Sequence, residues 1–168
     1  MKHTIRLNMG DGLRVKDNVA ITVRDIRTGR IKQQSGGHNV AMDDWKSLTA
    51  KAWGGIVADS AVHYLAWGTG TTAPDSSLHQ MTAEVGRMPI TQVVQGSTGV
   101  VVLRTILNGN TANGVTIGEF MLYGGATATE AVNTGTPAAW YLWGAGDGGP
   151  HAKLPTESIQ LDWTLTEA

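Results

Sequence analysis

Several carboxylates have the chemistry needed for general acid–base catalysis, and they are Asp75, Glu84, Glu119, Asp147 and Glu157. Two carboxylates are enough for glycoside hydrolysis, so pattern alone does not dismiss such an enzyme. Glu119 stands out because its neighbours are apolar on both faces of an expected strand, which predicts partial burial. Pairing with Arg87 or Arg104, or acceptance of backbone amide hydrogen bonds, accounts for such a glutamate better than catalysis does. The sequence therefore predicts no catalytic residue.

A glycine-rich stretch at residues 68–73, GTGTTA, matches the loose dinucleotide-binding fingerprint G-x-G-x-x-G/A. That fingerprint requires a strand–helix–strand unit, but here residues 74–77 read PDSS and no amphipathic helix develops after them. We interpret the stretch as a flexible loop at the rim of the fold. No nucleotide or other cofactor is predicted.

The sequence contains no metal-binding pattern. It has no cysteine, which excludes a disulfide framework, a thiolate zinc site and a cysteine nucleophile. The five histidines never fall four residues apart on an expected helix. His38 near Asp43, or His79 near Asp75 and Glu84, would bind a metal only if folding happened to gather further ligands. No metal site is predicted.

The six tryptophans raise the question of a carbohydrate platform. Trp140 and Trp143 adjoin the glycine-rich residues 144–149, where a sugar could stack. Because positions 140 and 143 face opposite sides of a regular strand, we favour a core or protein-interface position for both. Trp67, just before the GTGTTA loop, is likewise assigned to the core or an interface. The remaining tryptophans on inward-facing stripes are predicted core residues: Trp45, Trp53 and Trp163.

Composition and charge narrow the class of protein. The chain has 168 residues, 22 glycines, 41% hydrophobic residues and 16% charged residues, which fits one folded domain rich in turns. The net charge of −1 gives no general argument for nucleic-acid binding, and no apolar run is long enough to span a bilayer. Basic residues dominate up to Gly55 and acidic residues dominate after it, so the two parts could attract each other within one molecule or between copies.

The N-terminal 35 residues read as a cationic β-ribbon with a docking role. Residues 5–9 and 13–15 alternate around a Gly-Asp-Gly turn, and residues 19–23 and 30–34 alternate around Thr28-Gly29. The polar face of this ribbon carries the basic residues Arg14, Lys16, Arg24, Arg27, Arg30 and Lys32.

Residues 36–168 are predicted to form the sandwich. One amphipathic helix is expected over residues 41–53, because its apolar residues recur with helical spacing and Gly54-Gly55 follows. Short alternating or apolar runs predict strands at 62–67, 88–95, 99–107, 115–123, 138–143 and 159–165. The expected fold is a single domain, mainly β: an antiparallel, jelly-roll-like β-sandwich with one short helix.

A series of motifs follows in a characteristic order. After the basic hairpin come GHNV at residues 37–40, a helix with Trp45, and YLAWGTGTTAP at residues 64–74. The later members are Asp75, Leu78, Glu84, Arg87, EFMLY at residues 119–123 and LDWTLT at residues 161–166. In this order they resemble small virion structural proteins of tailed bacteriophages, from about Val19 to the end. Met121 replaces a glycine of the family pattern, and residues 138–150 are longer and richer in tryptophan and glycine.

The resemblance implies a noncatalytic building block of the tail, baseplate or fibre, with other phage structural proteins as partners. It also implies a homo-oligomer or multi-copy assembly in the virion, formed in the host cytoplasm. Capsid decoration is one alternative. A module that binds or cleaves a host surface glycan is another. The residues assigned to the protein interface are Arg14, Lys16, Arg24, Arg27, Arg30, Lys32, Trp67, Trp140 and Trp143.

Overall fold

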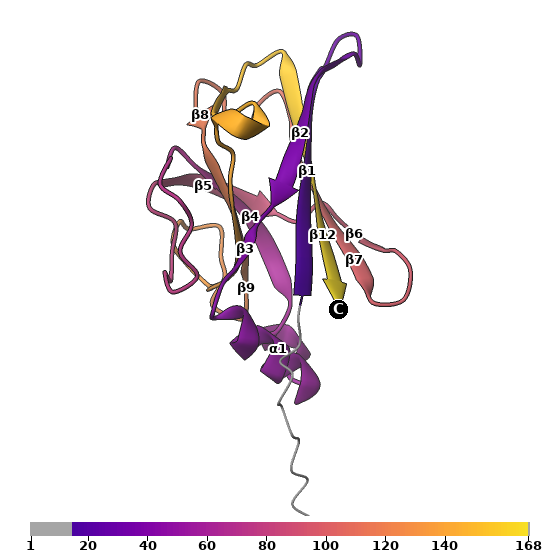
Figure 1. Ribbon diagram of the computed structural model, residues 1–168, viewed down its shortest axis with the longest axis vertical. Coiled ribbons are helices and arrows are strands. Elements are labelled where there is room, and N and C mark those ends of the chain that lie inside the picture. Colours follow the sequence, from indigo (N-terminus) through magenta and orange to yellow (C-terminus); the bar gives the residue numbers. More distant parts are fainter. Residues whose placement is uncertain (1–14, 168) are drawn as a thin grey trace, which may run out of the picture.

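The computed structural model describes residues 15–167 and shows two five-stranded antiparallel sheets packed on each other. Strands make up 47% of the structure and helices 10% (Figure 1). The predicted antiparallel β-sandwich with one short α-helix is therefore confirmed. Within the described residues, no helix is long and apolar enough to cross a membrane.

The first sheet combines the N-terminal hairpin with the C-terminal strand. Its order is β2 (Ile31–His38), β1 (Val15–Asp25), β12 (Glu157–Glu167), β7 (Val100–Leu107) and β6 (Gln92–Gln95). β1 pairs with β12 along its whole length, from Val15 opposite Glu167 to Asp25 opposite Glu157. The described part of the predicted ribbon, residues 15–35, is thus paired into the first sheet of the sandwich. Residues 1–14, with the expected strand at 5–9 and Arg14, lie outside the described residues.

The second sheet has the order β3 (Val40–Ala41), β10 (Thr136–Leu142), β9 (Glu119–Gly124), β4 (Val62–Gly68) and β5 (Glu84–Pro89). β9 is buried at every position, because both of its faces are covered. One face contributes to the main core between the sheets, and the other packs in a second cluster with Met42, Met81 and Trp140. Burial on both faces explains why this strand is apolar throughout.

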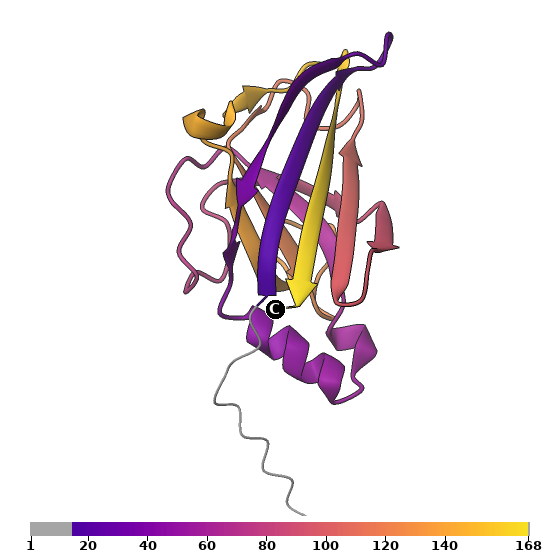
Figure 2. The same ribbon diagram turned by 45° about the vertical axis from the view of Figure 1, so that its right-hand side comes forward.

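The α-helix is shorter than predicted. α1 spans Trp45–Trp53, whereas residues 40 and 41 form β3 and pair with Trp140 and Ala139. Of the helical residues only Leu48 is buried, and Trp53 is 62% exposed, so its assignment to the core is wrong. The helix closes one end of the sandwich and is followed by the 3-10 turn η1 (Val57–Asp59) (Figure 2).

Two predicted strands are divided in the structure. The expected strand at 88–95 is two strands in different sheets, because the chain crosses between the sheets after Pro89. The expected strand at 115–123 is interrupted at Gly118, between β8 (Thr116–Ile117) and β9. The Gly118 N–H donates to the Gly68 carbonyl at 2.9 Å, and its carbonyl accepts from the Trp143 N–H at 2.8 Å. β8 instead pairs with β11 (His151–Ala152), which follows the 3-10 turn η2 (Ala145–Asp147).

Candidate functional site

The three tryptophans assigned to an interface are core residues. Trp140 and Trp143 have no exposed surface, and Trp67 is 6% exposed. Trp143 stacks on His151, with ring centroids 5.4 Å apart, and its indole N–H donates to the Asp147 carbonyl at 3.1 Å. Neither Trp140 nor Trp143 can offer a face to a sugar or to a protein partner in this fold. Both the interface assignment and the carbohydrate-platform alternative are therefore corrected for these residues.

The GTGTTA loop surrounds the Glu119 carboxylate. The Glu119 Oε1 atom accepts hydrogen bonds from the Gly70 and Ala83 amides, each at 3.2 Å. A Cβ atom at Gly70 would lie 2.3 Å from this oxygen, and one at Gly68 would lie 2.5 Å from it. The two glycines are thus needed because the backbone passes directly over the carboxylate. Since Thr69 N–H also donates to the Ala83 carbonyl at 3.0 Å, the loop is held in place rather than free at the rim.

Glu119 is completely buried at the start of β9. Burial raises the pKa of its carboxyl group, against the lowering effect of the Ala83 and Gly70 amides and of the Trp140 and Thr82 side chains. The prediction that this glutamate accepts backbone amides is confirmed at Oε1, and Arg87 and Arg104 pair with Glu84 and Asp162 instead. Such a carboxylate can hold a loop but has no open surface at which to meet a substrate.

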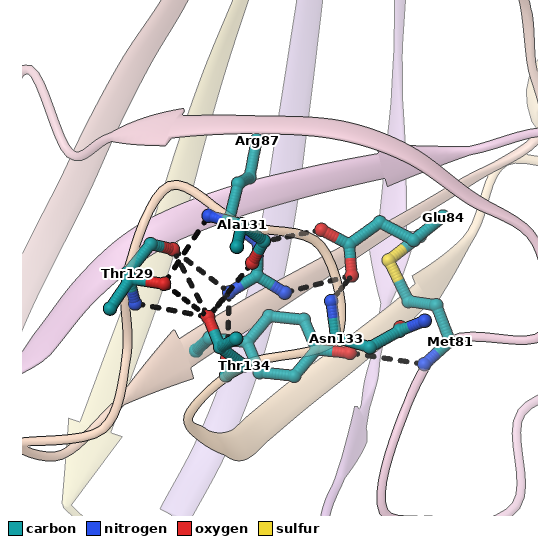
Figure 3. A network of polar contacts seen from close by, with 8 residues as sticks. Met81, Glu84, Arg87, Thr129, Ala131, Asn133 and Thr134 are labelled. Atoms are coloured by element: carbon teal, nitrogen blue, oxygen red, sulfur yellow. Dashed lines mark hydrogen bonds and ion pairs between the residues drawn. The ribbon is translucent and has the colours of Figure 1, made fainter.

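A second polar network joins β5 to the loop between β9 and β10 (Figure 3). Arg87 makes a two-pronged pair with Glu84, Nε to Oε1 at 2.6 Å and Nη2 to Oε2 at 2.8 Å. Its Nη1 atom donates to the Thr134 carbonyl at 2.6 Å, while the Asn133 amide donates to Glu84 Oε2 at 2.8 Å. The guanidinium also lies over the Tyr123 ring, 4.2 Å from its centroid.

The Glu84 and Arg87 side chains are entirely buried, so this pair acts as an internal clamp. Because both charges are fully hydrogen-bonded, removing either would leave the other buried without its partner. Tyr123, whose ring contacts the Arg87 guanidinium, also accepts a hydrogen bond from the Met81 amide through its hydroxyl at 3.0 Å. Burial raises the pKa of Tyr123 to about 12. The Glu84–Arg87 pair thus links β5 to Tyr123 of β9 and to the loop between β9 and β10.

A third polar cluster centres on Glu157 at the start of β12. Its carboxylate accepts from Lys32 Nζ, from the Leu154 amide at 3.2 Å and, as a pair, contacts His151 Nε2 at 3.0 Å. Burial alone would raise the pKa of Glu157, but these hydrogen bonds outweigh it and the pKa is lowered. Lys32, assigned to docking from the sequence, is therefore engaged within the molecule. Nearby Lys153 is fully buried, and burial lowers its pKa.

The histidines within residues 15–167 do not gather metal ligands. His79 Nδ1 lies 2.7 Å from Asp44 Oδ2, rather than near Asp75 or Glu84. This contact is on the surface and raises the pKa of His79. Across residues 15–167, no group of three potential ligand side chains is close enough to hold a metal ion.

The tip of the β1–β2 hairpin is a cationic and apolar surface at the end opposite α1 (Figures 1 and 2). Asp25 shapes it, because its carboxylate accepts from the Arg27 and Thr28 amides at 3.1 and 2.8 Å. Ile26 is 52% exposed and Ile31 is 42% exposed. We call residues 24–31 the hairpin tip. Among the described residues, the guanidinium groups of the tip make no ion pair: Arg24, Arg27 and Arg30.

An apolar groove of about 470 Å³ opens at the α1 end of the sandwich. The helix supplies one wall, the residues leading into β4 supply another, and the inner face of the first sheet supplies the third. Its main apolar lining residues are Trp45, Leu48, Ala52, Trp53, Val62, Val93, Val101, Leu103 and Leu165. Sequence patterns do not predict this groove, because its lining comes from five separate segments: α1, the start of β4, β6, β7 and β12.

The family models, the curated proteins and the solved structures with which the chain was compared include no match to it. The function must therefore be argued from the surfaces and clusters described above.

Proposed function

We propose that the protein is a noncatalytic structural component of a tailed-bacteriophage virion, associated with the tail, baseplate or fibre. It acts by binding other phage structural proteins and is present in many copies. The order of the sequence motifs supports the virion setting. The observation that carries the binding role is the hairpin tip, where three arginines without an ion pair among residues 15–167 lie beside two exposed isoleucines.

The motif residues themselves support a scaffold rather than a reaction centre. Glu84, Arg87 and Glu119 are the ionisable residues of the motifs that would be first choices for chemistry. All three are buried and hydrogen-bonded to loops that they hold in place. Because these buried, hydrogen-bonded charges hold the loops in place, the surface of the protein keeps a defined shape. A defined surface shape suits assembly with other proteins.

The chemistry of the hairpin tip indicates its partner. Arginine forms two-pronged hydrogen bonds with carboxylates, and it is favoured at protein interfaces together with apolar side chains. An acidic protein surface with a shallow apolar depression would bind Arg27, Arg30 and Ile26 together. Such a partner is favoured over a host glycan, because the tryptophans proposed to stack on a sugar are buried.

The location can be tested by immunogold electron microscopy of purified phage particles from a culture that produces the protein. The probe is an antibody raised against the purified chain, and particles lacking the gene serve as the control. We expect label on the tail, baseplate or fibres, repeated on every particle. Label confined to the head would favour capsid decoration, and absence of label from intact and from gently opened particles would contradict a virion role.

A further inference from the structure

The α1 end of the molecule carries a concentration of exposed apolar side chains. Trp53, Ile56, Val57 and Val93 are 62%, 52%, 70% and 63% exposed. They are four of the ten exposed large hydrophobic residues in the described part of the chain. Trp53 and Val93 also line the apolar groove, and the Ile56 amide donates to the Lys51 carbonyl at 2.9 Å, which holds this residue against the helix end. We call these four residues and the groove the groove face.

The groove exists because part of the inner face of the first sheet is not covered by another element. Val93 of β6 pairs with Leu103 of β7, so both side chains are on the inner face of the sheet. Leu103 is only 6% exposed, whereas Val93, on the edge strand β6, is 63% exposed. A strip of apolar surface on the inner face of the sheet is therefore open to water, which is unfavourable.

We infer that the groove face is covered by the groove face of a second copy of this chain, related by a two-fold axis. A two-fold interface brings the same patch of both subunits together, so that patch must contain both a projection and a matching recess. The groove face meets this requirement, because exposed Trp53 lines the groove, and exposed Ile56 and Val57 lie in the segment between the lining residues Trp53 and Ser60. Each copy would insert these side chains into the groove of the other.

Charges beside the groove face fit the same arrangement. Lys51 is in the last turn of α1 and Asp59 is the last residue of η1, so a base and an acid flank the exposed Ile56 and Val57 along the chain. Neither side chain forms an ion pair within residues 15–167. A two-fold axis through the apolar residues would place each Lys51 opposite the other copy's Asp59, giving two equivalent pairs.

This inference deepens the proposed function and rests on it for the presence of many copies. α1, which forms one wall of the groove, lies at the opposite end of the sandwich from the tip of the β1–β2 hairpin (Figure 2). A dimer formed through the groove face would therefore leave two hairpin tips pointing outward, free for acidic partners. Two tips on one dimer would bind a repetitive virion surface more tightly than a single tip.

The test is sedimentation equilibrium of the full chain from about 1 µM to about 1 mM. We expect the wild-type protein to form dimers and no larger species. Trp53→Asp and Ala52→Trp, which remove the projection and fill the recess, should each weaken dimerisation at least about tenfold. Leu154→Asp is the matched control, because it charges an exposed apolar residue in the segment beside the hairpin tip, where the Ile26 N–H donates to the Thr156 carbonyl. Circular dichroism checks that every variant is folded.

Charge-exchange variants distinguish a specific dimer from nonspecific hydrophobic association. Lys51→Glu and Asp59→Lys should each weaken dimerisation, and the double variant should restore it, because the pairs re-form with opposite sense. A monomeric wild-type protein would overturn the inference and leave the groove to residues 1–14 or to another protein. Equal dimerisation by wild type, Trp53→Asp and both single charge variants would overturn it too. Particle labelling does not depend on either result, so the virion proposal can fail or stand separately.

Discussion

Single residues show how buried charge is used to hold loops in this fold. Glu119, Glu84 and Glu157 are all buried, and each accepts hydrogen bonds from a segment distant in sequence. The carboxyl groups differ in the balance between burial and pairing. Burial dominates at Glu119 and raises its pKa, whereas hydrogen bonds from Lys32, His151 and Leu154 dominate at Glu157 and lower its pKa.

The raised pKa of Glu119 predicts a pH dependence of stability. Because the folded pKa is above the unfolded one, the stabilising contribution of this group is complete below the unfolded pKa and is lost as pH rises through the folded pKa. Glu119→Gln keeps an oxygen for the Gly70 and Ala83 amides but cannot ionise. We expect the variant to gain stability relative to wild type between pH 4 and pH 8, with the larger gain at the higher pH.

Urea unfolding across this pH range measures the free energy of unfolding of both proteins. Glu130→Gln, which removes an exposed carboxylate, provides the control for a general change in charge. Parallel stability curves for wild type and Glu119→Gln would show that ionisation of Glu119 carries no folding cost.

At the scale of elements, the loop of residues 68–73 depends on a glycine at position 70. A Cβ atom there would lie 2.3 Å from Glu119 Oε1 and 2.5 Å from its Cδ, both deep in the core. Gly70→Ala should therefore lower the free energy of unfolding by about 1–3 kcal/mol, as expected for overpacking a buried position. Thermal or urea unfolding measures the loss.

Gly146→Ala is the matched control, since a Cβ atom at that glycine meets nothing within 4 Å and its φ is not positive. A loss of stability as large in Gly146→Ala as in Gly70→Ala would refute the packing explanation. Equal stability of Gly70→Ala and wild type would mean that the loop can move away from the carboxylate.

The sequence predicted most elements but not the places where tertiary contacts divide them. β12 was predicted because Ile159, Leu161 and Trp163 alternate with polar residues. The helix was predicted four residues too long, because Ala41 and Met42 continue its apolar spacing although β3 pairs with β10. Local periodicity contains no information on such pairing, which joins residues about one hundred positions apart. The break between β5 and β6 was missed for the same reason.

Local sequence patterns predict polar surface residues better than they predict which apolar residues are covered. The exposed arginines of the hairpin tip follow from a polar face that local alternation reveals. Trp53 was assigned to the core and Trp140 to an interface or the core, since an apolar stripe does not reveal whether another element covers it. The groove face was not foreseen, because its residues come together only in the folded chain.

For the whole molecule, the two ends of the sandwich have different chemistry. The hairpin tip is cationic with exposed isoleucines, and the groove face is apolar with one lysine and one aspartate beside it. The overall charge of −1 conceals this division. A particle subunit with distinct ends can bind a copy of itself through one and a different protein through the other, which fits the proposed role in assembly.

Charge reversal at the hairpin tip should reduce incorporation of the protein into particles. Replacing Arg24, Arg27 and Arg30 by glutamate reverses the charge of the tip and should repel an acidic partner. Fold stability should change little, because none of the three guanidinium groups makes an ion pair within the described residues and exposed charges contribute little. Complementing particles that lack the gene measures incorporation, as the copies of the chain retained per particle in quantitative mass spectrometry.

The corresponding arginine-to-glutamine triple variant separates charge reversal from loss of specific hydrogen bonds. If long-range charge drives docking, the neutral variant should retain more incorporation than the reversed one, and raised salt should weaken binding of the wild type. If two-pronged hydrogen bonds to carboxylates drive it, both variants should fail alike. Normal incorporation of the reversed variant, with its fold intact by circular dichroism, would exclude the hairpin tip as the docking surface.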